Sequence, residues 1–130
     1  MTWLLALALA QPYTIEKGPD ATLAAGSKGS LELRIVIKGE RFFLPPDAPL
    51  LVKLFAEGDV AVERSLLKRE DAVDPRPGEK AHQMTFRIPV AAAQTGERGI
   101  VRAEILFYVG TPTWSREVRE TARWNVSVKR

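Results

Sequence analysis

The side chains that could carry catalysis or hold a metal are few in this chain. It contains one histidine, His82, and no cysteine. The absence of thiols excludes disulfides, thiolate catalysis and thiolate metal sites, and a single imidazole excludes a multi-histidine metal site within one chain. His82 lies in a polar stretch just before a predicted strand, a context typical of a surface histidine. Ser115 and Thr111 have no histidine near them in sequence, so a nucleophile–base pair would need His82 from another strand.

Carboxylates offer an equally weak case for acid–base catalysis. Asp74 can be paired with Asp71 or with Glu79, but these acids lie in or beside a proline-rich segment that gives no reason for burial. Without burial, their pKa values are not tuned for proton transfer. The acids between residues 59 and 74 lack the ligand spacing of a calcium loop, and no glycine-rich phosphate cradle occurs. The sequence therefore predicts no catalytic residue, no metal site and no cofactor.

The overall composition is that of a folded domain with a mildly basic surface. The chain has 130 residues, of which 45% are hydrophobic and 27% charged, and its formal net charge is +3. These values are typical of one globular domain. Nucleic-acid binding proteins concentrate lysine and arginine on one stripe with few acids between them. Here the charges alternate in sign in the runs 68–71 and 116–120, which predicts a solvated surface and no nucleic-acid partner.

The N-terminal residues suggest export. Residues 1–10 form an apolar run that ends in Ala8-Leu9-Ala10, a small-x-small pattern that suits signal peptidase. Cleavage there would leave one domain over residues 11–130, periplasmic or secreted. The run is too short to span a bilayer as a helix, which needs about 20 residues, so we expect no transmembrane span. Because no lysine or arginine precedes the run, the alternatives are a buried first strand or helix, or a start codon assigned too late.

Alternation of apolar and polar residues with a period of two is the dominant pattern of the chain. It covers four segments, and two shorter strand candidates lie at residues 50–56 and 60–64. Turn signals rich in glycine, proline and aspartate separate the segments, and no long amphipathic helix occurs. About seven short strands punctuated in this way predict an all-β antiparallel sandwich. The predicted inward-facing residues are Leu31, Leu33, Ile35 and Ile37; Met84, Phe86, Ile88 and Val90; Val101, Ala103, Ile105, Phe107 and Val109; and Ala122, Trp124, Val126 and Val128.

Two apolar side chains depart from the alternation near the end of one strand. Leu106 and Tyr108 lie on the face that otherwise carries Arg102 and Glu104, just before Gly110. One interpretation is that a loop covers both side chains. The other is that they form a small exposed apolar patch that contacts a partner. The sequence leaves both interpretations open.

Several segments along the chain, taken in order, follow the pattern of a known family. They are a turn and strand at 25–39, Pro46-Asp47-Ala48-Pro49 within 42–50, a glycine turn at 58–60, the Phe-x-Ile-Pro-Val strand 86–90, a strand ending at 107–111, and the last strand 124–128. In this order and spacing they resemble the N-terminal periplasmic domain of the thiol–disulfide interchange protein DsbD, over nearly the whole mature chain. The resemblance implies an immunoglobulin-like β-sandwich outside the cytoplasm.

The resemblance also implies where the family's redox centre would lie. The first catalytic cysteine would fall at Gly110 and the second near Ser115 or Arg116, while Phe43 and Pro45 stand where the family often has histidine and asparagine. A redox relay needs a thiolate nucleophile and a second sulfur to close the disulfide. Thiol–disulfide exchange therefore cannot carry over to this chain.

Trp114 lies in the segment that replaces the family's reactive centre, which we expect to be a loop over Gly110–Arg119. Tryptophan and arginine dominate the hot spots of protein interfaces, and Arg116 lies two residues away. Alternatively, Trp114 folds back over the end of the sandwich. Family geometry would bring further aromatic residues beside this loop. The predicted partner-binding set is Phe42, Phe43, Tyr108, Thr111, Trp114 and Arg116.

Three functional hypotheses follow from these patterns. The leading one is an exported, non-catalytic interaction module that binds an unidentified periplasmic or membrane-associated protein, with the oligomeric state left open. The second is a structural accessory sandwich that adds an edge strand to an assembly. The third is a hydrolytic or metal-dependent enzyme, which would require a convergent polar pocket containing His82.

Overall fold

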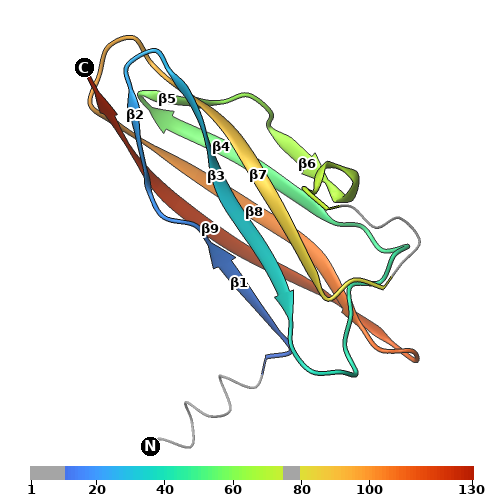
Figure 1. The fold of residues 1–130 in the computed structure, drawn as a ribbon. Coiled ribbons are helices and arrows are strands. Elements are labelled where there is room, and N and C mark those ends of the chain that lie inside the picture. Colours follow the sequence, from blue (N-terminus) through green and yellow to red (C-terminus); the bar gives the residue numbers. More distant parts are fainter. Residues whose placement is uncertain (1–10, 75–79) are drawn as a thin grey trace, which may run out of the picture.

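The chain folds as a β-sandwich, as its alternation predicts. The computed structural model describes residues 11–74 and 80–130, so the predicted signal peptide over 1–10 lies outside the described residues. Two sheets pack face to face (Figure 1). The strands of the described residues are β1 Tyr13–Lys17, β2 Ala21–Ala24, β3 Lys28–Ile37, β4 Leu51–Gly58, β5 Val60–Val62, β6 Leu66–Lys68, β7 Gln83–Ala92, β8 Arg98–Gly110 and β9 Ser115–Lys129, with one 3-10 turn, η1 Arg69–Asp71.

The strand order departs from a purely antiparallel sandwich at one pair. The four-stranded sheet has the order β1-β3-β7-β5, and the five-stranded sheet has the order β2-β9-β8-β4-β6. Every pairing is antiparallel apart from β2 with β9, which is parallel. Between β1 and β2 the chain leaves one sheet and joins the other, and Pro19, which has no N–H for a ladder, lies at this crossing. The parallel direction of β2 corrects the prediction that all strands are antiparallel. Alternation of apolar and polar residues specifies which face of a strand is buried, but not the direction of the strand.

The predicted core residues face the interior in all four alternating segments. Each of the inward positions in 31–37, 84–90, 101–109 and 122–128 is buried. Trp124, Phe86 and Phe107 are completely enclosed between the sheets. Burial of each such side chain contributes about 1.5–3 kcal/mol. The two faces of these strands are therefore assigned by the hydrophobic effect.

The hairpin of β8 and β9 is longer than the sequence suggests. Pairing runs without interruption from Arg98 opposite Ser127 to Gly110 opposite Ser115. The two strands are joined by a tight turn in which the Thr111 N–H donates to the Trp114 carbonyl at 2.8 Å. The predicted loop over Gly110–Arg119 is therefore wrong beyond this turn. The charged residues of this segment hid its strand pattern. At the end of the hairpin, strand positions face solvent and carry polar side chains, whereas the corresponding positions deeper in the sandwich are apolar.

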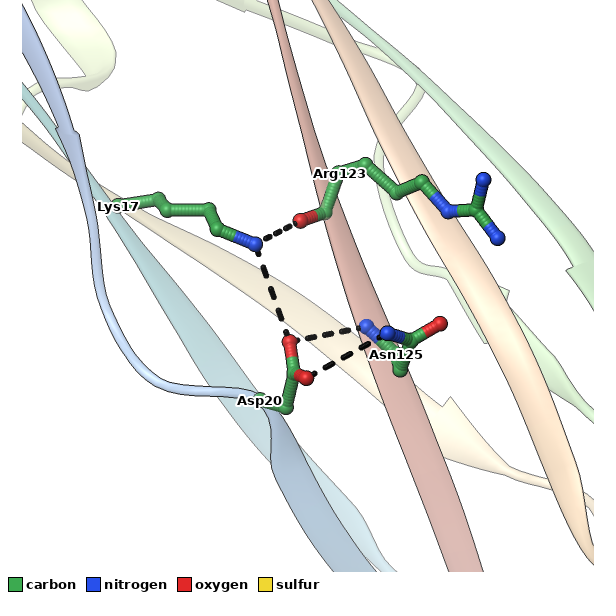
Figure 2. Close-up of polar contacts among 4 residues, drawn as sticks. All are labelled: Lys17, Asp20, Arg123 and Asn125. Atoms are coloured by element: carbon green, nitrogen blue, oxygen red, sulfur yellow. Dashed lines mark hydrogen bonds and ion pairs between the residues drawn. The ribbon is translucent and has the colours of Figure 1, made fainter.

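β2 covers only one end of the outer edge of β9. It pairs with residues 126–129 and stops there. The next backbone groups along the edge are capped by side chains, as Figure 2 shows. The Asn125 N–H donates to Asp20 Oδ1 at 3.0 Å, and Lys17 Nζ donates to the Arg123 carbonyl. Lys17 Nζ also lies 3.9 Å from Asp20 Oδ1.

We call these four residues, Lys17, Asp20, Arg123 and Asn125, the Asp20 clamp. The hydrogen bond from the Asn125 backbone, followed by that from its side chain and the charge of Lys17, holds the pKa of Asp20 below its ordinary value. The clamp fastens the crossing between β1 and β2 to β9. It satisfies the edge of β9 where the ladder to β2 ends.

Tyr13 closes the same side of the sandwich nearer the β8–β9 turn. Its ring packs edge-on against Phe107, with the centroids 5.3 Å apart and the planes at 87°. Its hydroxyl donates to a carboxylate oxygen of Glu120. Burial, together with this hydrogen bond and the charge of Glu120, raises the pKa of Tyr13 to about 12.

Candidate functional site

The segment at residues 42–45 closes the end of the sandwich beside the β8–β9 turn. Phe43 bridges to Gly110 through two backbone hydrogen bonds, from Phe43 N at 3.0 Å and from Gly110 N at 2.9 Å. Leu44 bridges to Ala81, and its N–H donates to the Ala81 carbonyl at 2.7 Å. Because Leu44 is fully buried, this segment seals the core between the two sheets. The expected proximity of the segment to Gly110 is thereby explained by backbone pairing.

Trp114 is the most exposed aromatic side chain at this end. It is 46% exposed, and its ring lies edge-on to Phe42 with the centroids 6.1 Å apart and the planes at 67°. Arg116 follows two residues later, near the start of β9, and is exposed. We call Phe42, Trp114 and Arg116 the Trp114 surface. It faces solvent beside a hydrogen-bonded turn.

The other residues of the predicted binding set do not join this surface. Phe43 is only 9% exposed, and Lys80 Nζ lies 4.8 Å from the centre of its ring. Thr111 is 8% exposed, and its hydroxyl lies 3.4 Å from the Thr113 hydroxyl. Tyr108 lies on the outer face of β8, where its hydroxyl donates to Glu117 Oε2 at 3.3 Å. Burial and these contacts therefore set Phe43, Thr111 and Tyr108 apart from the Trp114 surface, and partner binding by the predicted set stays a prediction.

Gly110 lies where a side chain has no room. A Cβ atom on Gly110 would stand 2.9 Å from Pro45 Cγ and 3.2 Å from the Trp114 carbonyl oxygen. It would also stand 3.5 Å from the Cβ of Ser115, the residue directly opposite on β9. That last spacing lies within the range of about 3.5–4.5 Å between the Cβ atoms of a disulfide. Of the two predicted positions for a second cysteine, Ser115 shares the face of Gly110 and Arg116 does not, because adjacent residues of a strand point to opposite faces.

Arg69 holds Pro45 over Gly110, a role that the sequence did not reveal. Its Nη2 donates to the Pro45 carbonyl at 2.6 Å. Desolvation lowers the pKa of Arg69 from its usual value, and the charge of Asp47 partly opposes this. The mixed charges of residues 68–71 predict a solvated surface, and the partial burial of Arg69 corrects that prediction for this residue. Only the folding of η1 against the 42–50 segment brings this guanidinium inward.

Asp71, one of the candidate acid–base carboxylates, is held by hydrogen bonds from nearby residues of the chain. It accepts two hydrogen bonds from Arg64, at 2.8 and 3.2 Å, and one from the Lys68 N–H at 2.9 Å. The bonds from Arg64 and then from Lys68 lower the pKa of Asp71 below its usual value. A carboxylate held ionised in this way is poorly suited to accept a proton at neutral pH. Asp71 therefore fastens η1 to the preceding loop.

Leu106 is covered by its neighbours within the sheet. Leu51 and Arg119 lie directly opposite Leu106 on the two adjacent strands, and Leu106 is half-buried between them. A shallow hollow of about 300 Å³ opens beside it, with Lys53, Glu104 and Thr121 among its lining residues. Charged side chains thus surround the apolar one. Leu106 lies away from the Trp114 surface.

His82 lies at the surface near Thr111 and Thr113. It is exposed and lines a shallow hollow of about 490 Å³ with Lys80 and Thr111. Within residues 11–74 and 80–130, no hydrogen bond to the His82 side chain is formed, and no cluster of three or more potential metal ligands occurs. In the same residues, no helix has the length and apolar character to cross a membrane.

Comparison with known proteins supports the fold. No family model and no curated protein matches the chain. Among solved structures, an Escherichia coli alpha-2-macroglobulin fragment from domain MG7 to the C-terminus matches with a TM-score of 0.58 and 21% identity, over 93% of this chain and 17% of that one. The native E. coli protein and a Salmonella alpha-2-macroglobulin variant match with the same TM-score and identity, over 92% of this chain and 7% of theirs. The chain thus spans less than a fifth of these proteins, and the likeness establishes an immunoglobulin-like β-sandwich fold.

Proposed function

We propose that this chain is an exported, non-catalytic interaction module that binds a periplasmic or membrane-associated protein through the Trp114 surface. The observation that carries the proposal is the 46% exposure of Trp114 on a turn fixed by backbone hydrogen bonds. A rigid aromatic side chain in this setting loses little conformational entropy when a partner covers it. Its position therefore suits an interface anchor.

The size of the expected effect follows from the exposed area. A tryptophan buries about 150–250 Å² when it is enclosed, so the exposed half of Trp114 offers about 100 Å² to a partner. At about 25 cal/mol per Å², covering that area contributes about 2.5 kcal/mol. This magnitude is that of an interface hot spot. Arg116, exposed and two residues further along the chain, adds a charged donor.

The proposal includes descent from a thiol–disulfide interchange scaffold that has lost its reactive centre. Support comes from the 3.5 Å spacing between an added Cβ on Gly110 and the Cβ of Ser115. Pro45 fills the space in front of Gly110, so the replacement is a packed structure in which no thiol is present. On this view the scaffold persists because its end presents Trp114 to a partner.

The test is recovery of partners from a periplasmic extract on the immobilised chain. We expect Trp114→Ala combined with Arg116→Ala to reduce recovery of a specific partner by at least about tenfold. Phe55→Ala is the matched control, because Phe55 is also an exposed aromatic side chain, at 39%, but lies on β4. Equal recovery by the double variant and the wild type would refute a role for the Trp114 surface.

A second candidate function is favoured by the uncovered part of β9. Among the strands of residues 11–74 and 80–130, only β2 pairs with this edge, at residues 126–129, which leaves the edge between Ser115 and the Asp20 clamp available to another strand. The chain would then act as a structural accessory domain that extends a sheet of its assembly. Thr121→Pro tests this, because it removes an N–H that points away from β8. Unchanged assembly by that variant, with Trp114 variants defective, would exclude edge pairing.

A further inference from the structure

From Ser115 to Thr121, the outer edge of β9 has no partner strand in the part of the chain that the structure describes. Thr111 N donates to the Trp114 carbonyl, so even-numbered residues of β9 bond to β8 through the continuous antiparallel ladder. The odd-numbered residues point their N–H and C=O groups the other way, as Asn125 and Arg123 do in the Asp20 clamp (Figure 2). In the described residues no strand pairs with β9 on that side before Val126. The free edge is about 20 Å long at about 3.3 Å per residue.

The charges along this edge have a particular order. They run Arg116, Glu117, Val118, Arg119, Glu120, so that each charge has its opposite at the same distance on the other side of Val118. Reversal of the strand therefore gives the complementary pattern. An antiparallel copy of the same segment meets an opposite charge at each charged position.

We propose that two copies of this chain pair through the free edges of β9, antiparallel and with Val118 facing Val118 across a twofold axis. This inference rests on the edge-pairing candidate function and names its partner. Arg116 of each copy then faces the partner's Glu120, and Glu117 faces the partner's Arg119. The two five-stranded sheets join into one continuous sheet, a self-complementary arrangement with closed twofold symmetry.

The backbone parity agrees with this register. Glu117 faces the partner's Arg119, and Ser115 faces the partner's Thr121, so every such pair joins residues whose N–H and C=O groups point outward. About eight backbone hydrogen bonds would then form between the two copies. Val118 is 6% exposed and already packed in its own chain, so the backbone and the charges carry the pairing.

Other registers lose the complementarity. Moving the twofold axis by one residue places Glu117 opposite Glu117 or Arg119 opposite Arg119, and like charges directly opposite each other destabilise a strand pair. The complementary window ends at Thr121, and beyond it the Asp20 clamp occupies the backbone groups of Arg123 and Asn125. Charged residues and capped groups usually protect an edge from pairing. Here the capping begins where the complementary order stops.

The glutamate and arginine beside Val118 allow a sharp test by charge exchange, with the full chain in analytical ultracentrifugation. In Glu117→Arg, an arginine faces the partner's Arg119 twice, and in Arg119→Glu, a glutamate faces the partner's Glu117 twice. We expect each variant to raise the dimer dissociation constant at least about tenfold. An equimolar mixture of the two variants restores both opposite-charge pairs, and we expect a heterodimer of intermediate mass in native mass spectrometry.

The mixture separates pairing between chains from effects within one chain. Arg119 Nε donates to Glu117 Oε1 of its own chain at 2.5 Å, and both single variants make that internal pair like-charged. Recovery on mixing therefore has no intrachain source. Arg102→Glu is the control, because it makes the same charge change on β8, one strand in from the edge, and we expect the wild-type dissociation constant.

Three outcomes would overturn the inference. They are a wild-type chain that stays monomeric up to millimolar concentration, single variants that dimerise as tightly as the wild type, or a mixture that forms no heterodimer. If the chain is monomeric but Thr121→Pro still abolishes its assembly with another protein, self-pairing fails and the edge-pairing candidate function stands. If Thr121→Pro changes neither dimerisation nor assembly with another protein, the self-pairing inference and the edge-pairing candidate function both fail.

Discussion

The packing of Pro45 on Gly110 makes a quantitative prediction about stability. Gly110→Ala adds a Cβ 2.9 Å from Pro45 Cγ, and Pro45 is held by Arg69 at 2.6 Å. The bridge between Phe43 and Gly110 further restricts movement of either segment. Overpacking of this kind costs about 1–3 kcal/mol. Gly110 does not have a positive φ, so alanine also stabilises by about 0.4–1 kcal/mol through the unfolded chain.

We therefore expect Gly110→Ala to lower the free energy of unfolding by about 1–2 kcal/mol. Pro45→Ala removes Cγ but keeps the carbonyl that accepts from Arg69, so the double variant loses the unfavourable contact. The double variant should be more stable than the sum of the single effects predicts, by about 1–2 kcal/mol. The measurement is urea unfolding followed by tryptophan fluorescence, for which the buried Trp124 is a reporter.

A second glycine provides the control. A Cβ on Gly29 would approach Leu23 Cδ2 to 2.5 Å, but that atom is the end of a flexible side chain that can rotate away. Gly29→Ala should therefore destabilise the fold less than Gly110→Ala. Additive effects of the substitutions at 45 and 110, or an equal loss at 29 and 110, would refute the argument that Pro45 blocks the Gly110 position.

Three further predictions follow from the contacts around β8 and β9. In a Pro45→Ala chain, Gly110→Cys with Ser115→Cys should form a disulfide on mild oxidation. Gly110→Cys with Arg116→Cys should keep both thiols free, as measured by mass spectrometry. Tyr13 should ionise at about pH 12, so its contribution to stability is fully present below about pH 10 and is lost as the pH rises from there through 12; a tyrosinate absorbance titration that Tyr13→Phe leaves unchanged would contradict this. Asp20→Ala should increase hydrogen exchange at the β9 amide it caps at least about tenfold, with amides in the middle of β8 unaffected, and equal protection in both chains would exclude a role for the clamp.

The core could be predicted from the sequence because the alternation of a long strand can be read from that strand's own residues. Each inward position of the four alternating segments had to be apolar, and Trp124, Phe86 and Phe107 lie where the period of two places them. The short strands were harder to detect. β1 and β2 each contribute two inward apolar residues at most, and β6 has three residues in all. Alternation over so few positions resembles a loop.

The candidate site depended on contacts between distant segments, which a single sequence does not encode. Pro45 and Gly110 have complementary volumes, but neither residue type alone indicates the other. Arg69 sits in a run of charges and turns inward only because η1 folds against the 42–50 segment. The exposed position of Trp114 was one of two interpretations of its segment, and the structure selects it through the short turn that ends β8.

The parallel pairing of β2 with β9 has a mechanical consequence. Ala21–Ala24 and Val126–Lys129 run in the same direction, so a pull on the start of β2 against the end of β9 moves these strands past each other along their axes. The hydrogen bonds between them are then loaded together, in shear, and not opened one after another as in a pulled hairpin. The Asp20 clamp adds side-chain contacts beside this short ladder, which share the load with it (Figure 2). Resistance to a pull between the start of β2 and the end of β9 should therefore depend on these few residues more than on the large core.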